Sequence, residues 1–516
     1  MTGLSRRALL AGVAGSAVIS AAGCSAAPTD EPTDEPTPTP EPPPVVITRA
    51  PTESTSVAGG SAVLAAAMSG LLLERSQVAV LSSDDPAMLE TAAALAQAGR
   101  WPVLVGTRAS LPAETRAELD RLGVEHLVVV DSEDPEQDET TMTTQPGLED
   151  FAVTVVPAAP SPTLPDGVPV GDATDGMPVF LVVDAEAAGA AAAATARAFG
   201  AVTHTDIGDP REMADVMSSL REQSDSPLVA MAAQAAGAET LLVQSTMAQR
   251  APELPGGGVT VFPHRRMIAL YGHPGVPVLG LLGEQGLEAS IERVGEYVER
   301  YSPLVEEPVI PAFEIIASVA TAGAGPDQQY SKIWPPEIFR AWVDAAKDAG
   351  VYVVLDLQPG RTDFLTQAKA YEELLIEPHV GLALDPEWRL GPNERHLVRI
   401  GSVEAAEINA VSEWLAELVR THDLPQKVLT LHQFRLSMIK DRETVRTDHP
   451  EIAVVLHADG QGGQGAKQDT WRVLKEDLPE DMWLGWKNFY DEDTPMLTPE
   501  QTVAQVDPVP WFISYQ

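Results

Sequence analysis

Acidic side chains stand at or near the ends of three apolar segments in the second half of this chain. Asp385 and Glu387 end one segment, and Asp356 and Glu314 lie in the two segments before it. Because side chains alternate along a strand, Asp385 and Glu387 would share one face with small residues. Two carboxyl groups in different environments can divide into a proton donor and a base or nucleophile, as glycosidic bond cleavage requires. We predict Glu387 as the acid and Asp385 or Asp356 as its partner.

Other polar and aromatic residues near the segment ends complete a candidate substrate site. Flat aromatic rings offer apolar surfaces for sugars, and eight of the nine tryptophans fall between Trp334 and Trp511. The predicted substrate-binding residues are Glu314, Gln358, Trp388, His432, His457, Asp459, Trp486, Lys487 and Tyr490. The alternatives are ordinary packing for the tryptophans, and an ion pair with Arg389 or Lys487 for the two carboxyl groups.

Histidines and an aspartate at the ends of further segments offer a second chemistry. His273, His432, His457 and Asp459 could together hold a divalent metal ion that activates water. Metal-dependent amidohydrolase barrels, however, carry a His-x-His on their first strand and an Asp on the last, and neither is present here. The sequence therefore favours a site without metal or other cofactor, and metal-dependent hydrolysis is the alternative.

Eight apolar segments separated by mostly helical patterns must position these residues. The predicted strands are 267–273, 313–319, 351–358, 380–387, 427–434, 452–459, 482–489 and 511–516. Amphipathic periodicity predicts helices over 336–349 and 404–420. This alternation is typical of a (β/α)8 barrel of the TIM type over 266–516, in which catalytic groups sit at the carboxyl ends of the strands.

The fourth of these segments also resembles a known family feature. Asp385-Pro-Glu387-Trp388 resembles the fourth-strand Asp-x-Glu segment of several glycoside hydrolase barrels. The resemblance implies a carbohydrate-active hydrolase.

The region 57–265 alternates apolar strands with alanine-rich helical patterns, which predicts a Rossmann-like parallel α/β region. Within it, 77–131 resembles a cell wall binding repeat of the second type, and "LPAETRAELDRLG" is the specific part of the match. A weaker second copy extends over 179–231. The resemblance implies docking onto anionic wall polymers, and the alternative is a scaffold without a ligand. No Gly-x-Gly-x-x-Gly motif follows the first strand of either copy, so a dinucleotide site is not predicted.

The first 56 residues have the composition of a leader and a linker. Ser5-Arg6-Arg7 precedes an apolar stretch too short to span a bilayer, which predicts a signal peptide over 1–23. The stretch resembles a bacterial lipoprotein signal with a twin-arginine export motif, which implies lipid attachment at Cys24, the only cysteine. Proline-rich residues in 24–56 cannot bury a core and predict a stalk.

The formal net charge of −41 argues against nucleic acid as a partner, because phosphates demand a basic surface. We therefore expect an exported protein, anchored to the outer face of the cell membrane through its lipid alone. The predicted function is hydrolysis of a cell-wall or extracellular polysaccharide. The alternative from a different class is a non-catalytic glycan-binding lipoprotein.

Overall fold

The computed structural model describes residues 44–131, 147–172, 176–177, 180–184, 187–396 and 398–516. The predicted signal peptide, Cys24 and most of the predicted stalk lie outside the described residues. Within those ranges, no helix combines the length and the apolar character that a membrane span needs.

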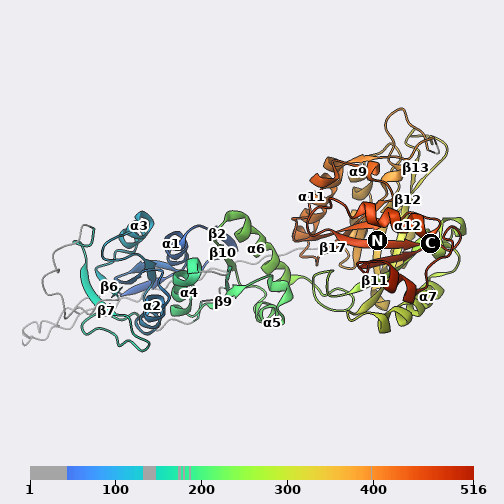
Figure 1. The fold of residues 1–516 in the computed structure, drawn as a ribbon. Coiled ribbons are helices and arrows are strands. Elements are labelled where there is room, and N and C mark those ends of the chain that lie inside the picture. The colour runs from blue at the N-terminus through green and yellow to red at the C-terminus, as the bar shows by residue number, and fades with distance from the viewer. Residues whose placement is uncertain (1–43, 132–146, 173–175, 178–179, 185–186, 397) are drawn as a thin grey trace, which may run out of the picture. The chain divides into compact units, whose positions relative to one another are not determined.

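Eight parallel strands close into a barrel in the second half of the chain (Figure 1). They are β11 (Arg266–Gly272), β12 (Val309–Ala320), β14 (Tyr352–Leu357), β15 (Val380–Leu384), β17 (Lys427–Gln433), β19 (Ile452–Ala458), β20 (Trp483–Asn488) and β21 (Phe512–Tyr515). Each strand pairs with the next, and β11 pairs with both β12 and β21, which closes the ring. The prediction of a closed barrel of eight parallel strands is confirmed.

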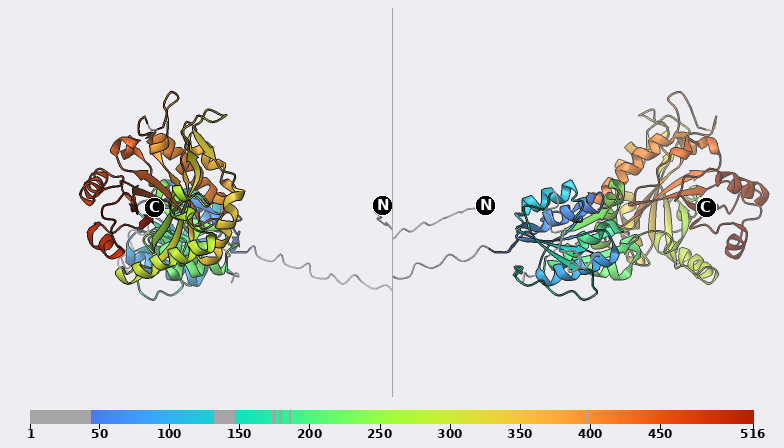
Figure 2. Two further views of the ribbon diagram at one scale, coloured as in Figure 1. Left: turned by 90° about the vertical axis from the view of Figure 1, so that its right-hand side faces the viewer. Right: turned by 60° about the vertical axis from the view of Figure 1, so that its left-hand side comes forward.

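Helices surround the barrel strands (Figure 2). They are α7 (Leu287–Tyr301), α8 (Glu337–Ala349), α9 (Phe364–Lys369), α10 (Glu372–Leu375), α11 (Ala405–Thr421), α12 (Gln464–Leu474) and α13 (Pro499–Gln505). Helix α8 shows why these segments are helical, since Phe339, Val343 and Ala346 recur at helical spacing and are buried together. It ends before Gly350, whose φ of 67° is a left-handed conformation that glycine adopts without strain.

Two features depart from a regular alternation of strands and helices. Between β17 and β19, the connection contains the short strand β18 (Ile439–Lys440), which pairs with β16 (Val403–Glu404), and 3-10 turns. Strand β13 (Ser331–Ile333) adds to β12 in the antiparallel direction.

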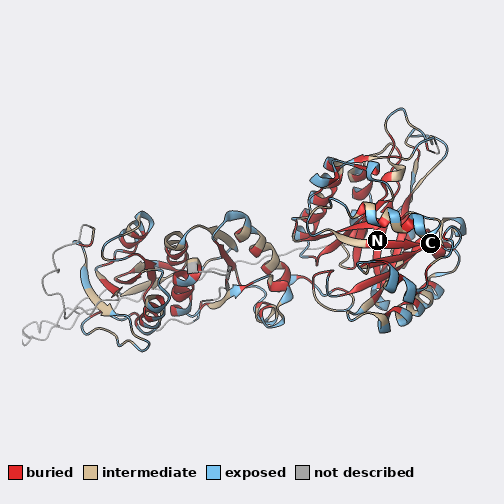
Figure 3. Ribbon diagram, viewed as in Figure 1, coloured by how far each residue is buried: buried red, intermediate tan, exposed pale blue. Residues whose placement is uncertain are grey.

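Successive side chains along each barrel strand point alternately outward and inward, which divides the barrel residues into an outer and an inner set. The outer set packs under the helices, for example Ile268, Leu270 and Phe313. The inner set forms an apolar layer that includes Met267 and Ala269. Figure 3 shows the barrel strands as almost continuously buried and the helices as exposed on one side. Polar residues follow the inner apolar layer toward the carboxyl ends of the strands, which is where a barrel of this type carries its site.

Strand β15 ends three residues earlier than the predicted strand 380–387. Pro386 has no N–H group and cannot continue the ladder. Instead, residues Pro386–Trp388 form a 3-10 turn, and the Asp385 carboxylate accepts a hydrogen bond from the backbone N–H of Glu387 at 3.3 Å. Glu387 is therefore positioned by this turn and not by the strand.

The first half of the chain contains two four-stranded parallel sheets. One has the order β5-β4-β6-β7, and the other has the order β9-β8-β10-β2. Their bounds are β2 (Thr55–Ala58), β4 (Val78–Ser82), β5 (Val103–Val105), β6 (His126–Asp131), β7 (Ala152–Pro157), β8 (Phe180–Asp184), β9 (Val202–Ile207) and β10 (Leu228–Ala232). The helices are α1 (Ser61–Leu72), α2 (Pro86–Gly99), α3 (Ala113–Leu122), α4 (Ala190–Ala198), α5 (Ala214–Glu222) and α6 (Ala235–Arg250). Strands β1 (Val46–Thr48) and β3 (Leu73–Ser76) form a separate antiparallel pair.

The two sheets share one topology. Each contains a unit of three strands joined by two helices, β4 to β6 in one sheet and β8 to β10 in the other. In each unit the first strand, β4 or β8, lies between the other two and pairs with both. The segments are those predicted as two copies of one unit, 77–131 and 179–231. The resemblance to cell wall binding repeats and the Rossmann-like character of the region stay predictions.

Candidate functional site

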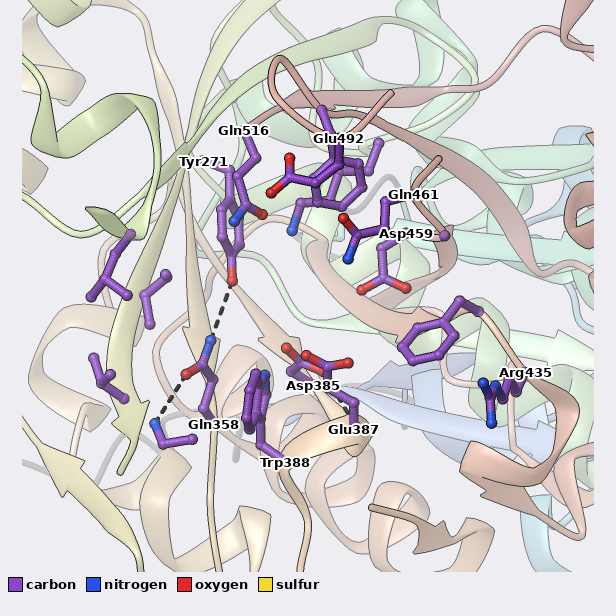
Figure 4. A pocket seen from close by; sticks show the side chains of 18 of the residues that line it. Tyr271, Gln358, Asp385, Glu387, Trp388, Arg435, Asp459, Gln461, Glu492 and Gln516 are labelled. Carbon is purple, nitrogen blue, oxygen red and sulfur yellow. Dashed lines mark hydrogen bonds between the residues drawn. The ribbon is translucent and has the colours of Figure 1, made fainter. Parts of the chain in front are cut away.

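A cavity of about 600 Å³ opens at the carboxyl ends of the barrel strands. Its polar lining includes Tyr271, Gln358, Asp385, Glu387, Asp459 and Lys487. Figure 4 shows Asp385 and Glu387 side by side, with the carboxylate of Asp459 facing them and the ring of Trp388 next to Glu387. The structure thus brings together both acidic residues of the fourth segment with a third from the sixth.

The carboxyl groups of Asp385 and Glu387 both favour the protonated form. Burial, followed by the negative charge of Glu387, raises the pKa of Asp385 well above its usual value. Burial and the negative charge of Asp459 raise the pKa of Glu387 to about 7. A carboxylic acid with a pKa near neutrality can hold and donate a proton at physiological pH.

His432 links Asp459 to a fully buried layer below the cavity. Its Nδ1 lies 3.1 Å from Asp459 Oδ2, and its Nε2 lies 2.8 Å from Glu314 Oε1. Burial alone would lower the pKa of His432, but the charge of Glu314 and the hydrogen bond with Asp459 outweigh it and raise the pKa well above its usual value. His432 in turn lowers the pKa of Glu314 and of Asp459 against the effect of burial. These three side chains therefore form a charged, hydrogen-bonded chain.

Tyr271 connects Asp356 to the cavity wall. Its hydroxyl donates to Asp356 Oδ2 at 2.8 Å, and Gln358 Nε2 lies 3.4 Å from the same hydroxyl. Burial raises the pKa of Asp356 to about 6. The ammonium of Lys487 lies 3.3 Å from the centre of the Tyr271 ring, a cation–π contact. Asp356 itself is fully buried and does not line the cavity.

The alternative interpretation of Asp385 and Glu387 as members of ion pairs does not match the geometry. Arg389 pairs with Glu407 at 2.9 Å. Lys487 lies over Tyr271, and within the part of the chain that the structure describes it makes no ion pair with either carboxyl group.

Five of the nine predicted substrate-binding residues do not line the cavity. Glu314, His432 and His457 lie in the fully buried layer below it, so the prediction that they contact substrate is wrong.

Trp486 and Tyr490 lie away from the cavity. Trp486 is buried on the outside of β20, where its ring packs edge-on against Trp471 of α12 at 5.6 Å. Because side chains alternate along a strand, the inward position of Lys487 forces Trp486 outward. Tyr490 makes a hydroxyl contact with Tyr297. The cavity lining includes neither ring, so the prediction that they contact substrate needs this correction.

The four residues predicted as alternative metal ligands do not form one group in the structure. His273 packs against Trp334, with ring centres 4.7 Å apart. The described residues that lie close enough together to hold a metal ion are Glu314, His432 and His457. His432 and His457 lie in the layer below the cavity, and His273 is not part of this group.

Sequence reasoning did not identify Tyr271 and Ser514 as members of the site. Tyr271 follows Met267 and Ala269 on the inward face of β11, so the alternation that found Glu314 and Asp356 applies to it as well. Ser514 holds the Nε2 atom of His457 at 3.0 Å. Serine on a short apolar strand carries no comparable signal.

Gly401 supports the turn that carries Glu387, and we predict that Gly401→Ala destabilises the fold. The Gly401 N–H donates to Glu387 O at 2.7 Å, and an added Cβ would lie 2.5 Å from Glu387 O and 2.7 Å from Pro386 O. Backbone atoms must shift to relieve these contacts. We expect the free energy of unfolding to fall by about 1–3 kcal/mol, measured by urea denaturation.

Gly465→Ala is the matched control for this substitution. Gly465 lies in α12, and an added Cβ meets nothing within 4 Å. It should be neutral or stabilising by about 0.5–1 kcal/mol. If Gly401→Ala and the unchanged chain had equal free energies of unfolding, Gly401 would not be needed to support the turn that carries Glu387.

Comparisons with known proteins leave the family open. No family model matches the chain, and no curated protein matches its sequence. Among solved structures, the chain is similar to the xylanase and α-amylase inhibitor protein of Scadoxus multiflorus, with 14% sequence identity and a TM-score of 0.29. The match covers 48% of this chain and 92% of that chain.

Proposed function

We propose that the barrel is a glycoside hydrolase and that Glu387 is its proton donor. The observation that carries this proposal is the position of Glu387 in a cavity at the carboxyl ends of the strands, with a pKa raised to about 7. Cleavage of a glycosidic bond needs an acid that is still protonated near neutral pH to protonate the leaving oxygen.

Asp459 is the candidate for the second carboxyl group. It lines the same cavity and faces Glu387, its Oδ2 is held by His432, and its Oδ1 has no hydrogen-bond partner among the described residues. A carboxylate in this position can stabilise the positive charge that develops on the sugar, or activate water. Of the two partners predicted from the sequence, Asp356 is engaged by Tyr271 below the cavity, and Asp385 favours its neutral form.

A neutral Asp385 has a different part in this proposal. Its carboxyl oxygen Oδ1 accepts a hydrogen bond from the N–H of Glu387, so Asp385 holds the turn that carries the donor. Because it is adjacent to Glu387, it can also donate a hydrogen bond to substrate while it is protonated. We assign it the positioning of Glu387 and of the sugar.

A polysaccharide fits the shape of the site. A second cavity of about 310 Å³ shares Glu387 and Trp388 with the first. A sugar chain occupying both cavities would have units on either side of the proton donor, with Trp388 as an apolar surface for one of them. The proposed substrate class is therefore a cell-wall or extracellular polysaccharide.

The remaining parts of the proposal concern location and partners. The lipoprotein-like leader would anchor the chain through Cys24 to the outer face of the cell membrane, with the stalk separating the folded part from the lipid. The region 57–265 would bind wall polymer and keep the barrel near its substrate. Nucleic acid is not a proposed partner.

The experiment is the release of reducing ends from purified wall and capsular polysaccharides by the full-length chain, across a pH series. Glu387 must be protonated to act, so we expect kcat to fall as the pH rises through about 7, by about tenfold per pH unit above it. Polysaccharide binding without turnover at any pH would instead identify a glycan-binding lipoprotein. A rate that increases through pH 7 would exclude Glu387 as the acid.

A further inference from the structure

Three fully buried side chains meet inside the barrel below the cavity. They are Glu314 on β12, His432 on β17 and His457 on β19, and each offers a ligand atom within 4.8 Å of the others. All three side chains are 0% exposed. Strands β12 and β17 are not neighbours in the sheet, so the contact between Glu314 and His432 crosses the barrel interior.

The spacing of these atoms suits a small tetrahedral ion. Bonds of 2.0–2.2 Å to a zinc ion place two ligand atoms roughly 3.3–3.5 Å apart. Here Glu314 Oε1 lies 2.8 Å from His432 Nε2 and 3.6 Å from His457 Nδ1. Asp356 Oδ1 lies 4.0 Å from His432 Nε2, and its carboxylate is the next acidic group that could supply a fourth ligand. The ligand atoms of Glu314, His432 and His457 all lie within 4.8 Å of one another, and the Asp356 carboxylate must move toward them to complete four ligands.

Several atoms in this layer lack hydrogen-bond partners although they are buried. Among the described residues, Glu314 Oε2, Asp356 Oδ1 and His457 Nδ1 have none. An unsatisfied buried polar atom destabilises the folded chain, and more so when it is charged. Asp356 Oδ1 and His457 Nδ1 are two of the proposed ligand atoms, so one ion would satisfy both, and its charge would also compensate the buried Glu314 carboxylate.

Both histidines also have the outer partners that are typical of metal ligands. A ligating imidazole almost always bonds through its other nitrogen to a carboxylate, a carbonyl or a similar group, which fixes the ring orientation. His432 uses Nδ1 for Asp459, at 3.1 Å, and His457 uses Nε2 for Ser514, at 3.0 Å. The two remaining nitrogens both face Glu314.

We propose that His432, His457, Glu314 and Asp356 bind one divalent transition-metal ion of the Zn²⁺ class as a structural site of the barrel. Two imidazoles among four ligands favour Zn²⁺ over Mg²⁺ or Ca²⁺, which prefer six or more oxygen atoms. Four protein ligands leave no open position for substrate, so the ion stabilises the interior and takes no part in turnover. The proposal does not depend on the hydrolase assignment.

The test uses the full-length chain, stripped with a chelator and then dialysed against Zn²⁺. We expect about one equivalent of bound zinc by elemental analysis, and a rise of roughly 5 °C in Tm that the chelator reverses. His457→Gln should abolish the bound equivalent. Ser514→Ala removes only the outer partner of His457 and should weaken zinc binding by about 10- to 100-fold.

His273→Gln is the matched control, because His273 is a buried histidine outside the cluster. This variant should bind zinc as the unchanged chain does. Less than about 0.1 equivalent in the unchanged chain, or equal binding by His457→Gln, would overturn the proposal. If His457→Gln does not fold, Ser514→Ala decides, since unchanged affinity in that variant contradicts a site at His457.

Discussion

Glu387→Gln is expected to lower kcat for polysaccharide hydrolysis by about 10²- to 10⁴-fold, the range that a general acid contributes. Glutamine keeps the size of the side chain but has no acidic proton to give to the leaving oxygen. The Pro386–Trp388 turn is held by the Asp385 carboxylate and the Gly401 N–H, which both bond to backbone atoms of Glu387. Neither contact is removed by the substitution, so the turn should keep its position. The measurement is reducing-end release at pH 6, with substrate above KM.

The stability of the same variant distinguishes loss of chemistry from loss of fold. Folding raises the pKa of Glu387 from 4.5 to about 7, so the folded state resists ionisation of this side chain. The folded chain thus loses stability as the pH rises from about 4.5 to 7, and the loss is complete above 7. Glutamine removes this cost, so at pH 8.5 the variant should be more stable than the unchanged chain by up to about 3 kcal/mol. At pH 4 the two should have similar stability.

Glu492→Gln is the matched control for activity, because Glu492 lines the same cavity and is exposed. Its kcat should stay close to that of the unchanged chain. Glu387→Gln with unchanged kcat would exclude Glu387 as the donor. If Asp459→Asn alone abolished turnover in that case, the acid would have to be sought on the β19 side of the cavity.

The barrel could be predicted because each strand carries a local signal. The apolar runs that contain β11 and β19 are bounded by polar residues and alternate with helical patterns, and parallel pairing follows from that alternation. Alternation along a strand likewise identified Glu314 and Asp356 as inward-facing. These inferences need only the period of a strand and the position of its ends.

The sequence could not predict how far below the cavity each inward-facing residue lies, or which residue it meets across the barrel interior. His432 meets Glu314 because β17 and β12 face each other through the interior, which no local pattern encodes. The sequence groups His273 with His432 because both are near strand ends, yet the His273 ring packs against Trp334. Trp486 was placed in the site by its proximity to a strand end, although Lys487 occupies the inward position.

The division of the carboxyl groups between two layers also depends on the fold. Asp356 and Asp385 are both inward-facing at the ends of adjacent strands, but only Asp385 reaches the cavity. Asp459 lies one residue beyond β19 and takes the position facing Glu387. Among these three carboxyl groups, the two just past a strand end reach the cavity, whereas Asp356, within β14, stays in the buried layer. This difference of one or two positions is smaller than the precision of strand ends inferred from sequence.

Lys467→Met is expected to lower the free energy of unfolding by about 3–5 kcal/mol, the cost of removing one partner from a buried ion pair. Lys467 on α12 pairs with Asp493, and both side chains are nearly inaccessible. Lys467 also donates to the carbonyl of Lys487 at 2.8 Å. The substitution leaves the Asp493 carboxylate buried, with only the N–H groups of Gly462 and Phe489 to compensate its charge. Urea denaturation at pH 7 measures the loss.

The size of this effect follows from burial, and an exposed pair on the same helix tests that cause. Arg472 pairs with Glu476 at 2.8 Å, but both side chains are more than half exposed, so water replaces the lost partner. Arg472→Met should therefore change the free energy of unfolding by less than about 1 kcal/mol. Equal losses in the two variants would mean that burial does not set the cost. A loss below about 1 kcal/mol in Lys467→Met would show that the two N–H groups are enough to stabilise Asp493, because hydrogen bonds to a charged group contribute about 1.5–3 kcal/mol each.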